Sequence, residues 1–319
     1  MLKKLQLPLN FQLLIVFFVL QGCASAPQSE KLLNAIPDKL PLYHELTSIP
    51  FFSQKAYQCG PAALSTMLHA NNINIKPADL IDKVYLPKRK GSLQIEIIST
   101  ARRYGLIPYL LRPQLEELLT EVSKGRPVLV FQNLGLTIFP QWHYAVVVGY
   151  DLNKQEIILR SGTEKRHISS IFDFEKSWLR AGHWSMLTLK PGELPSRPDE
   201  WRYVKAIIGF ERLSEWEILV KAYRSGLDIW PNSLELNLGM GNYHYQHKRL
   251  ELAMKFYKHI LNVNPNYAPA HNNLAQVLYE QGNYIIALQH AKYATAQKSK
   301  HLTQYKKTMS LIKKKLNLN

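Results

Sequence analysis

The segment QKAYQCGPAAL, residues 54–64, places a cysteine where a helix is expected to begin and a glutamine five positions before it. Pro61 fits the first turn of a helix, where its missing N–H is not needed. A thiol at a helix N-terminus loses its proton more readily than a free thiol, because the helix dipole and the peptide N–H groups favour the thiolate. Cys59 is therefore a candidate nucleophile, and a small buried hydrophobic residue is the alternative interpretation.

A cysteine nucleophile needs a base to take its proton, a group that orients this base, and hydrogen-bond donors for the oxyanion. His143, in QWHYAVVVGYD, opens an expected strand where its ring could face a cleft, and it is the candidate base. Gln54 is a candidate oxyanion donor through its side-chain N–H, together with the backbone N–H of Cys59. A histidine with a structural role is the alternative.

The elements that must position these residues are expected between residues 45 and 190. The sequence predicts helices over CGPAALSTMLHAN, over SLQIEIISTARRYG with Ser92 as its cap, and over QLEELLTEVSKG up to Gly125. VLVFQ is typical of a buried strand, and HYAVVVGYD with EIILRSG predicts a hairpin around residues 151–155. Helices followed by an antiparallel sheet indicate an α+β domain.

This combination resembles the bacteriocin-processing cysteine peptidases, family 39 of the papain-like clan. In that family Q-x(4)-CG-x-A opens the domain, and a later HY-x-V strand carries the histidine. The resemblance covers roughly residues 47–190, including GRPVLV before the histidine strand. It implies a papain-like fold in which Cys59 is the nucleophile, His143 the base and Gln54 the oxyanion donor.

One departure from the family concerns the group that orients the histidine. The family usually has ILDP after the histidine strand, with the aspartate orienting the imidazole, and the matching stretch here is ILRSG. Arg160 therefore stands where the acid is expected. Arginine accepts no hydrogen bond, and its charge disfavours a nearby imidazolium. Ser161 is a candidate orienter through its hydroxyl, and Asp151 is interpreted as a turn residue.

Residues 191–200 contain three prolines and predict a linker, after which the pattern is wholly helical. Within residues 201–300, pairs of residues stand 34 positions apart. Small residues or prolines recur at Ala253 and Ala287, Gly241 and Ala275, and Pro231 and Pro265, and Tyr257 corresponds to Ala291. This period resembles the tetratricopeptide repeat, with two copies and a degenerate unit that ends at Pro231. The resemblance implies an all-α solenoid whose concave surface binds a substrate or protein partner. An unrelated helical bundle is the alternative.

The first 22 residues have the features of a bacterial lipoprotein signal peptide. Lys3 and Lys4 precede the apolar run FQLLIVFFVL, which is shorter than the roughly 20 residues of a membrane span. LQGC, residues 20–23, resembles the lipobox and implies cleavage before Cys23 and lipid attachment to its sulfur. Ala24 is not the aspartate that retains lipoproteins at the inner membrane, so the resemblance implies the outer membrane, facing the periplasm. An ordinary secretory peptide with an incidental cysteine is the alternative.

Residues 23–44 are polar and contain prolines, which predicts a tether with little structure of its own. The sequence has two cysteines, so lipid on Cys23 leaves Cys59 as a free thiol in an exported protein. The net charge of +16 favours anionic surroundings. Much of it lies in residues 301–319, where a solvated basic helix face is expected and a site for lipid or polyanions is the alternative.

These observations leave two main functional hypotheses. The first is a lipid-anchored envelope cysteine peptidase whose helical repeats recruit a substrate or partner. The second is a peptidase-fold scaffold that binds but does not hydrolyse, and a related thiol reaction such as deamidation or amide transfer is a third possibility. We expect no cofactor, no metal site and no nucleic-acid partner, because the sequence lacks H-E-x-x-H, paired C-x-x-C, nucleotide-loop and nucleic-acid-binding motifs.

Overall fold

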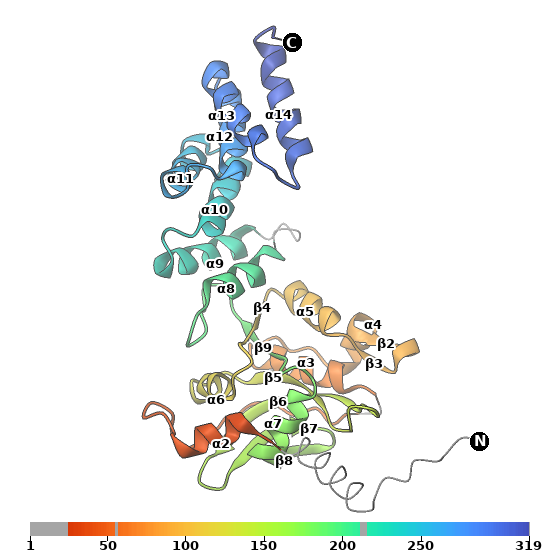
Figure 1. The fold of residues 1–319 in the computed structure, drawn as a ribbon. Helices are drawn as coiled ribbons and strands as arrows, with labels where there is room; N and C mark the ends of the chain where they lie inside the picture. Colours follow the sequence, from red (N-terminus) through yellow and green to blue (C-terminus); the bar gives the residue numbers. More distant parts are fainter. Residues whose placement is uncertain (1–24, 55–56, 211–215, 319) are drawn as a thin grey trace, which may run out of the picture. The chain divides into compact units, whose positions relative to one another are not determined.

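The computed structural model describes residues 25–54, 57–210 and 216–318. The chain divides into two compact units (Figure 1). Of the described residues, the first unit comprises those within 25–104 and Pro108–Thr188, and the second, the helical unit, comprises Gly105–Ile107 and those within 189–318. The predicted signal peptide and Cys23 lie outside the described residues. Among the described helices, none is both long enough and apolar enough to cross a membrane.

The described part of the first unit contains a seven-stranded sheet with the strand order β4-β9-β5-β6-β7-β8, in which β1 also pairs with β6. The pairs β5–β9, β5–β6, β6–β7, β7–β8 and β1–β6 are antiparallel. The strands are β1 (Tyr43–Glu45), β4 (Ile107–Leu110), β5 (Val128–Asn133), β6 (Trp142–Asp151), β7 (Glu156–Ser161), β8 (Glu164–Ser170) and β9 (Ser185–Leu189). The predicted buried strand and hairpin are therefore present as β5 and as β6–β7.

The sheet is covered by helices on both faces, which explains why β6 is buried from its third residue onward. Tyr144 faces helix α3 (Cys59–His69), and its hydroxyl donates a 3.3 Å hydrogen bond to the Ser92 carbonyl. Gln132 faces the opposite side, where its amide donates to Ser177 Oγ of helix α7 (Ile171–Leu179) at 2.7 Å. The remaining helices of this unit are α2 (Pro27–Asn34), η1 (Pro77–Leu80), α4 (Ile81–Val84), η2 (Pro87–Arg89), α5 (Gln94–Arg103) and α6 (Leu115–Ser123).

The segment predicted as an unstructured tether contains a packed helix instead. Helix α2 presents its free N-terminal amides to the buried carboxylate of Glu175, which accepts from Gln28 N at 2.9 Å and from Ser29 N at 2.6 Å. Leu32 of α2 is buried. A carboxylate at a helix N-terminus satisfies N–H groups that have no partner within the helix. The tether prediction was wrong because this partner lies in α7, far away in the sequence.

The predicted Ser92 cap is also wrong. Helix α5 begins at Gln94, and its N-cap residue Leu93 makes no side-chain cap hydrogen bond. Ser92 belongs instead to a two-stranded hairpin of β2 (Tyr85–Leu86) and β3 (Gly91–Ser92). Its side chain packs against helix α3, where the Cβ of an alanine at Gly60 would lie 2.2 Å from Ser92 Oγ. A glycine at position 60 therefore lets the hairpin lie directly against the first turn of α3.

The helical unit contains paired antiparallel helices of similar length. Its described helices are α8 (Glu200–Ile208), α9 (Trp216–Ile229), α10 (Leu234–Gln246), α11 (Leu250–Val263), α12 (Ala268–Glu280), α13 (Tyr284–Ala296) and α14 (Leu302–Lys315). The 34-residue spacing has a packing basis: a Cβ at Gly241 would lie 2.4 Å from the ring of Tyr257. One period later the same two positions hold Ala275 and Ala291, both in one core cluster. The basic C-terminal stretch forms α14, which buries Ile312 in that cluster.

Candidate active site

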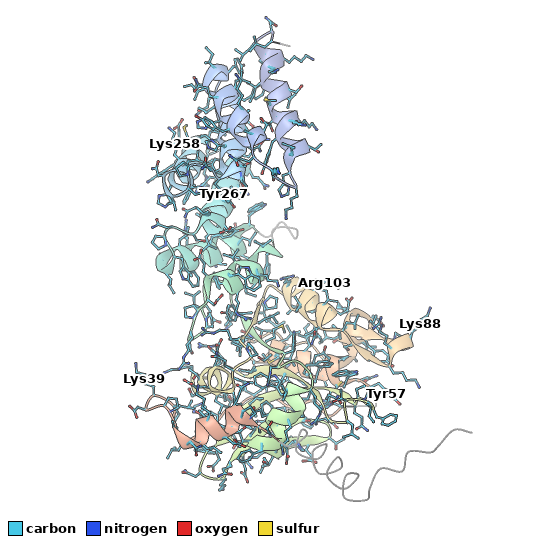
Figure 2. All side chains as sticks on the ribbon, in the orientation of Figure 1. Lys39, Tyr57, Lys88, Arg103, Lys258 and Tyr267 are labelled. Atoms are coloured by element: carbon cyan, nitrogen blue, oxygen red, sulfur yellow. The ribbon has the colours of Figure 1, made fainter. Side chains whose placement is uncertain are left out.

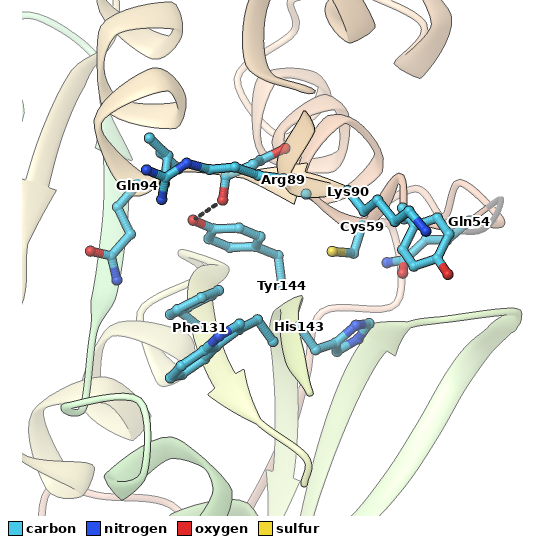
Figure 3. Close-up of a pocket in the computed structure, with 13 residues that line it drawn as sticks. Gln54, Cys59, Arg89, Lys90, Gln94, Phe131, His143 and Tyr144 are labelled. Atoms are coloured by element: carbon cyan, nitrogen blue, oxygen red, sulfur yellow. Dashed lines mark hydrogen bonds between the residues drawn. The ribbon is translucent and has the colours of Figure 1, made fainter. Parts of the chain in front are cut away.

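Cys59 is the first residue of helix α3 and lines a cavity of about 610 Å³ (Figure 3). The other lining residues come from the segment before α3, from the β2–β3 hairpin and the start of α5, and from β5 and β6: Gln54, Tyr57, Arg89, Lys90, Gly91, Ser92, Leu93, Gln94, Phe131, Trp142, His143 and Tyr144. The structure therefore brings Gln54, Cys59 and His143 to one cavity. Within the described chain, no hydrogen bond links Cys59 to His143.

Burial raises the pKa of the Cys59 thiol above its usual value. The backbone N–H groups of Tyr144, Gly60 and Cys59 itself act in the opposite direction, but burial is the larger effect. The amides of the helix N-terminus do lower this pKa as predicted, but desolvation penalises the thiolate more, so the expectation of a readily ionised thiol is wrong. The amides nevertheless show where negative charge on the sulfur would be stabilised. Tyr144 directly follows His143, so the sulfur lies at the start of β6.

His143 is the second residue of β6, opposite Gln132 of β5 in the strand register. Its Nε2 lies 2.8 Å from Ser161 Oγ, at the end of the neighbouring strand β7. A serine hydroxyl can donate or accept, so it permits either tautomer of the ring. When Nε2–H donates to Ser161, Nδ1 carries the lone pair and is free to accept a proton. Ser161 is thus placed as an orienter would be, and its effect on catalysis stays a prediction.

The ring of His143 is neutral at physiological pH. Burial and the charge of His167 lower its pKa to about 4. Together with the raised thiol pKa, this describes a resting pair of neutral thiol and neutral imidazole. In a neutral pair of this kind, the proton can be transferred only during attack, not from a preformed ion pair.

Gln54 borders the same cavity, and its backbone N–H donates to the Gly162 carbonyl at 3.0 Å. This bond fixes the residue next to the end of β7, close in sequence to Ser161. Figure 3 shows the Gln54 amide on the Cys59 side of the cavity. Asp151 lies at the far end of β6 and accepts a hydrogen bond from Lys154 N at 3.1 Å, as expected of a turn residue.

Arg160 does not take the place of an orienting acid beside the ring. The side chain is 4% exposed, and its guanidinium donates to the carbonyls of Ile49 at 3.1 Å and Lys165 at 2.7 Å. The charge that lowers the pKa of His143 is that of His167, not Arg160. The register between β7 and β8 shifts between Leu159 and Ser161, and such an irregularity changes where side chains point.

Several residues of the site were not anticipated from the sequence. Arg89 and Lys90 bring two cations to the Cys59 cavity. His143 also borders a second, polar cavity of about 520 Å³ that includes His167 of β8 and residues of α7. The run PKRKG is a basic turn in the sequence, but nothing in its spacing connects it to Cys59. No cluster of three or more metal-ligating side chains is found within the described residues.

Comparisons with known proteins find similarities to both parts of the chain. Residues 46–186 match the model of the Peptidase_C39 like family, and residues 256–289 match that of the tetratricopeptide repeat. A solved structure from Bacillus anthracis, described as a C39-like peptidase, is 17% identical with a TM-score of 0.39, covering 46% of this chain and 98% of that one. PilF of Pseudomonas aeruginosa is 20% identical with a TM-score of 0.35, covering 37% of this chain and 54% of its own. MamA is 13% identical with a TM-score of 0.34, covering 38% of this chain and 70% of MamA. No curated protein matched the chain.

Proposed function

We propose that this chain, which combines a peptidase C39-like domain over residues 46–186 with a tetratricopeptide repeat over residues 256–289, is a cysteine peptidase. Cys59 would be the nucleophile, His143 the base and Gln54 an oxyanion donor. The observation that carries the proposal is the common cavity that these three residues line, with the sulfur next to the backbone N–H of Tyr144, the residue that follows His143 in β6.

The neutral resting pair sets the order of proton transfers. As Cys59 Sγ attacks the peptide carbonyl, its proton passes to His143, and the C–S bond forms while the carbonyl π-bond opens to an oxyanion. The Cys59 backbone N–H and the Gln54 amide would donate to this oxyanion. Collapse of the intermediate breaks the C–N bond, and His143 returns the proton to the leaving amine. Water, deprotonated by His143, then hydrolyses the thioester and regenerates the thiol.

Labelling of Cys59 by an epoxide peptidase inhibitor at pH 7 tests the dyad. We expect the wild-type chain to be labelled at Cys59 and the His143→Ala variant to be labelled roughly a hundredfold more slowly, because the thiol then lacks its base. His301→Ala is the matched control, since His301 is an exposed histidine of the helical unit. Equal labelling of wild type and His143→Ala would count against the dyad and favour the alternative, a scaffold that binds without hydrolysis.

The proposal extends to the place of action. We infer that Cys23 carries lipid and holds the chain at a bacterial membrane, most simply the outer membrane facing the periplasm, on the strength of LQGC at residues 20–23. The helical repeats would recruit a protein substrate or partner, because stacked helix pairs offer an extended concave surface. Neither role requires chemistry from the helical unit.

A further inference from the structure

The cavity around Cys59 has an unusual charge. Of the described residues that line it, two are cations, Arg89 and Lys90, and none is an aspartate or glutamate. In Figure 3 the Arg89 side chain extends towards Gln94, whereas Lys90 extends towards Gln54. The two positive charges therefore point to different parts of the cavity that surrounds the sulfur.

The backbone that carries these two cations has a defined position. They belong to the turn of the β2–β3 hairpin, and β3 packs against the first turn of α3, where only a glycine at position 60 leaves room for Ser92. Lys90 has a φ of 46°, in the left-handed region that residues other than glycine seldom adopt. Residues held in sparsely populated backbone conformations are concentrated at ligand-binding sites. The packing thus fixes the position of the turn relative to Cys59.

Nothing in the described chain neutralises these charges. Neither Arg89 nor Lys90 forms an ion pair with a described residue, and both are exposed. The Lys90 ammonium instead lies 5.7 Å from the ring centre of Tyr57, another residue of the cavity. A cation over an aromatic face keeps its charge and remains able to bind a carboxylate.

The opposite wall of the cavity is aromatic. Phe131 stacks on Trp142 with ring centres 5.2 Å apart, and Tyr144 lies 4.6 Å from Phe131. Trp142 is 53% exposed, so the wall is open to a ligand. A ligand that contacts both walls carries an anionic group and a large apolar or aromatic group.

We propose that Arg89 and Lys90 select substrates with an acidic side chain close to the scissile bond, next to an aromatic or large aliphatic residue. This inference rests on the proposed peptidase function and names its substrate class, an acidic peptide segment. Arginine pairs with a carboxylate through two parallel hydrogen bonds, and lysine acts as a point charge, so Arg89 is the main determinant of side-chain recognition. Lys90 adds to the positive potential at the sulfur.

Alkylation by two small reagents tests the charge without requiring hydrolysis. In the full chain with Cys23→Ser, Cys59 is the remaining thiol. We expect the rate ratio of anionic iodoacetate to neutral iodoacetamide at Cys59 to exceed that of free cysteine. In the Arg89→Gln/Lys90→Gln variant this ratio falls roughly three- to tenfold, and 0.5 M salt lowers it in the wild type. Lys88→Gln is the matched control, because Lys88 lies in the same turn and projects away from the hairpin without lining the cavity (Figure 2).

Peptide electrophiles then test the substrate class. The fluoromethyl ketones of acetyl-Glu-Phe-Ala and acetyl-Gln-Phe-Ala differ in one charge. We expect the Glu probe to inactivate the wild type faster, the preference to disappear in Arg89→Gln/Lys90→Gln, and an Arg89→Glu/Lys90→Glu variant to prefer the corresponding Lys probe. Equal rates for the Glu and Gln probes, or a preference that survives the double substitution, would overturn the inference. The peptidase proposal would be untouched, because it depends on His143 rather than on these cations.

Discussion

At the residue scale, Ser161 is the residue that would most limit the proposed mechanism. Its hydroxyl lies 2.8 Å from His143 Nε2, where a carboxylate would hold the ring in one tautomer and stabilise its protonated form. The hydroxyl accepts or donates with similar ease and carries no charge. Burial and the charge of His167 consequently lower the pKa of His143 to about 4 without an opposing anion. In the proposed mechanism, His143 would therefore be a weak base.

Replacing Ser161 with aspartate should strengthen this base. The carboxylate favours the imidazolium, so the pKa of His143 rises from about 4. Because the ring must be unprotonated to accept the thiol proton, the acidic limb of the Cys59 inactivation profile moves to higher pH. On the plateau above this limb, we expect epoxide labelling of Cys59 to accelerate by roughly tenfold or more.

A pH–rate profile of labelling measures both effects in one series. Ser161→Ala is the control, because it removes the hydrogen bond without adding charge, and its plateau rate should fall below that of the wild type. An acidic limb that stays at the same pH in Ser161→Asp would mean that the residue does not act on the ring.

The chemistry of the site was predictable from the sequence only in outline. Gln54, Cys59 and His143 could be placed together because their types and order match a known pattern, and they share one cavity. The pKa of Cys59 could not be predicted, because its direction depends on how deeply the sulfur is buried. The sequence named Ser161 as the candidate neighbour of the ring, and its hydroxyl does lie 2.8 Å from His143 Nε2, but the register irregularity between β7 and β8 could not be predicted.

At the element scale, periodic segments were predicted well and segments with distant partners were not. Helix α3, strand β5 and the β6–β7 hairpin each carry their own pattern of apolar residues and breakers. Helix α2 depends on Glu175, and the β2–β3 hairpin depends on the glycine at position 60. Contacts between residues far apart in the sequence leave no periodic signal, so these two elements were missed or misread.

The repeat spacing in the helical unit makes a prediction about packing. A Cβ at Gly241 would lie 2.4 Å from the Tyr257 ring, so Gly241→Ala should lower the free energy of unfolding by roughly 1–3 kcal/mol. Tyr257→Ala should cost roughly 3–5 kcal/mol, because it leaves a cavity and removes the 3.0 Å hydrogen bond to Asn242. The double variant should cost no more than Tyr257→Ala alone, since the added methyl then meets no ring.

Urea unfolding of the full chain, with the transition of the helical unit monitored, gives the free energy of unfolding of each of the three variants and so completes a double-mutant cycle. The next repeat already has small residues at both positions, Ala275 and Ala291, so the double variant copies a natural arrangement. Strictly additive losses would show that Gly241 and Tyr257 do not share one packing site.

At the scale of the whole molecule, the two cysteines would have separate roles: Cys23 would attach the chain to a membrane, and Cys59 would react with substrate. The positive net charge of +16 is compatible with a position at an anionic membrane surface. A single acyl group binds a membrane only weakly, so stable anchoring requires several acyl chains or additional electrostatic attraction. Because the two proposed roles involve different cysteines, attachment at Cys23 should be separable from reactivity at Cys59.

Two single substitutions in bacterial cells test this separation. Cys23→Ser should abolish incorporation of labelled palmitate, while epoxide labelling of Cys59 continues. Cys59→Ser should have the opposite effect: palmitate and membrane location persist, and epoxide labelling is lost. Each variant is the control for the other, because both replace a thiol with a hydroxyl. Palmitate on the Cys23→Ser chain would exclude the anchor, and loss of epoxide labelling in that variant would mean that membrane attachment is needed for the reactive state of Cys59.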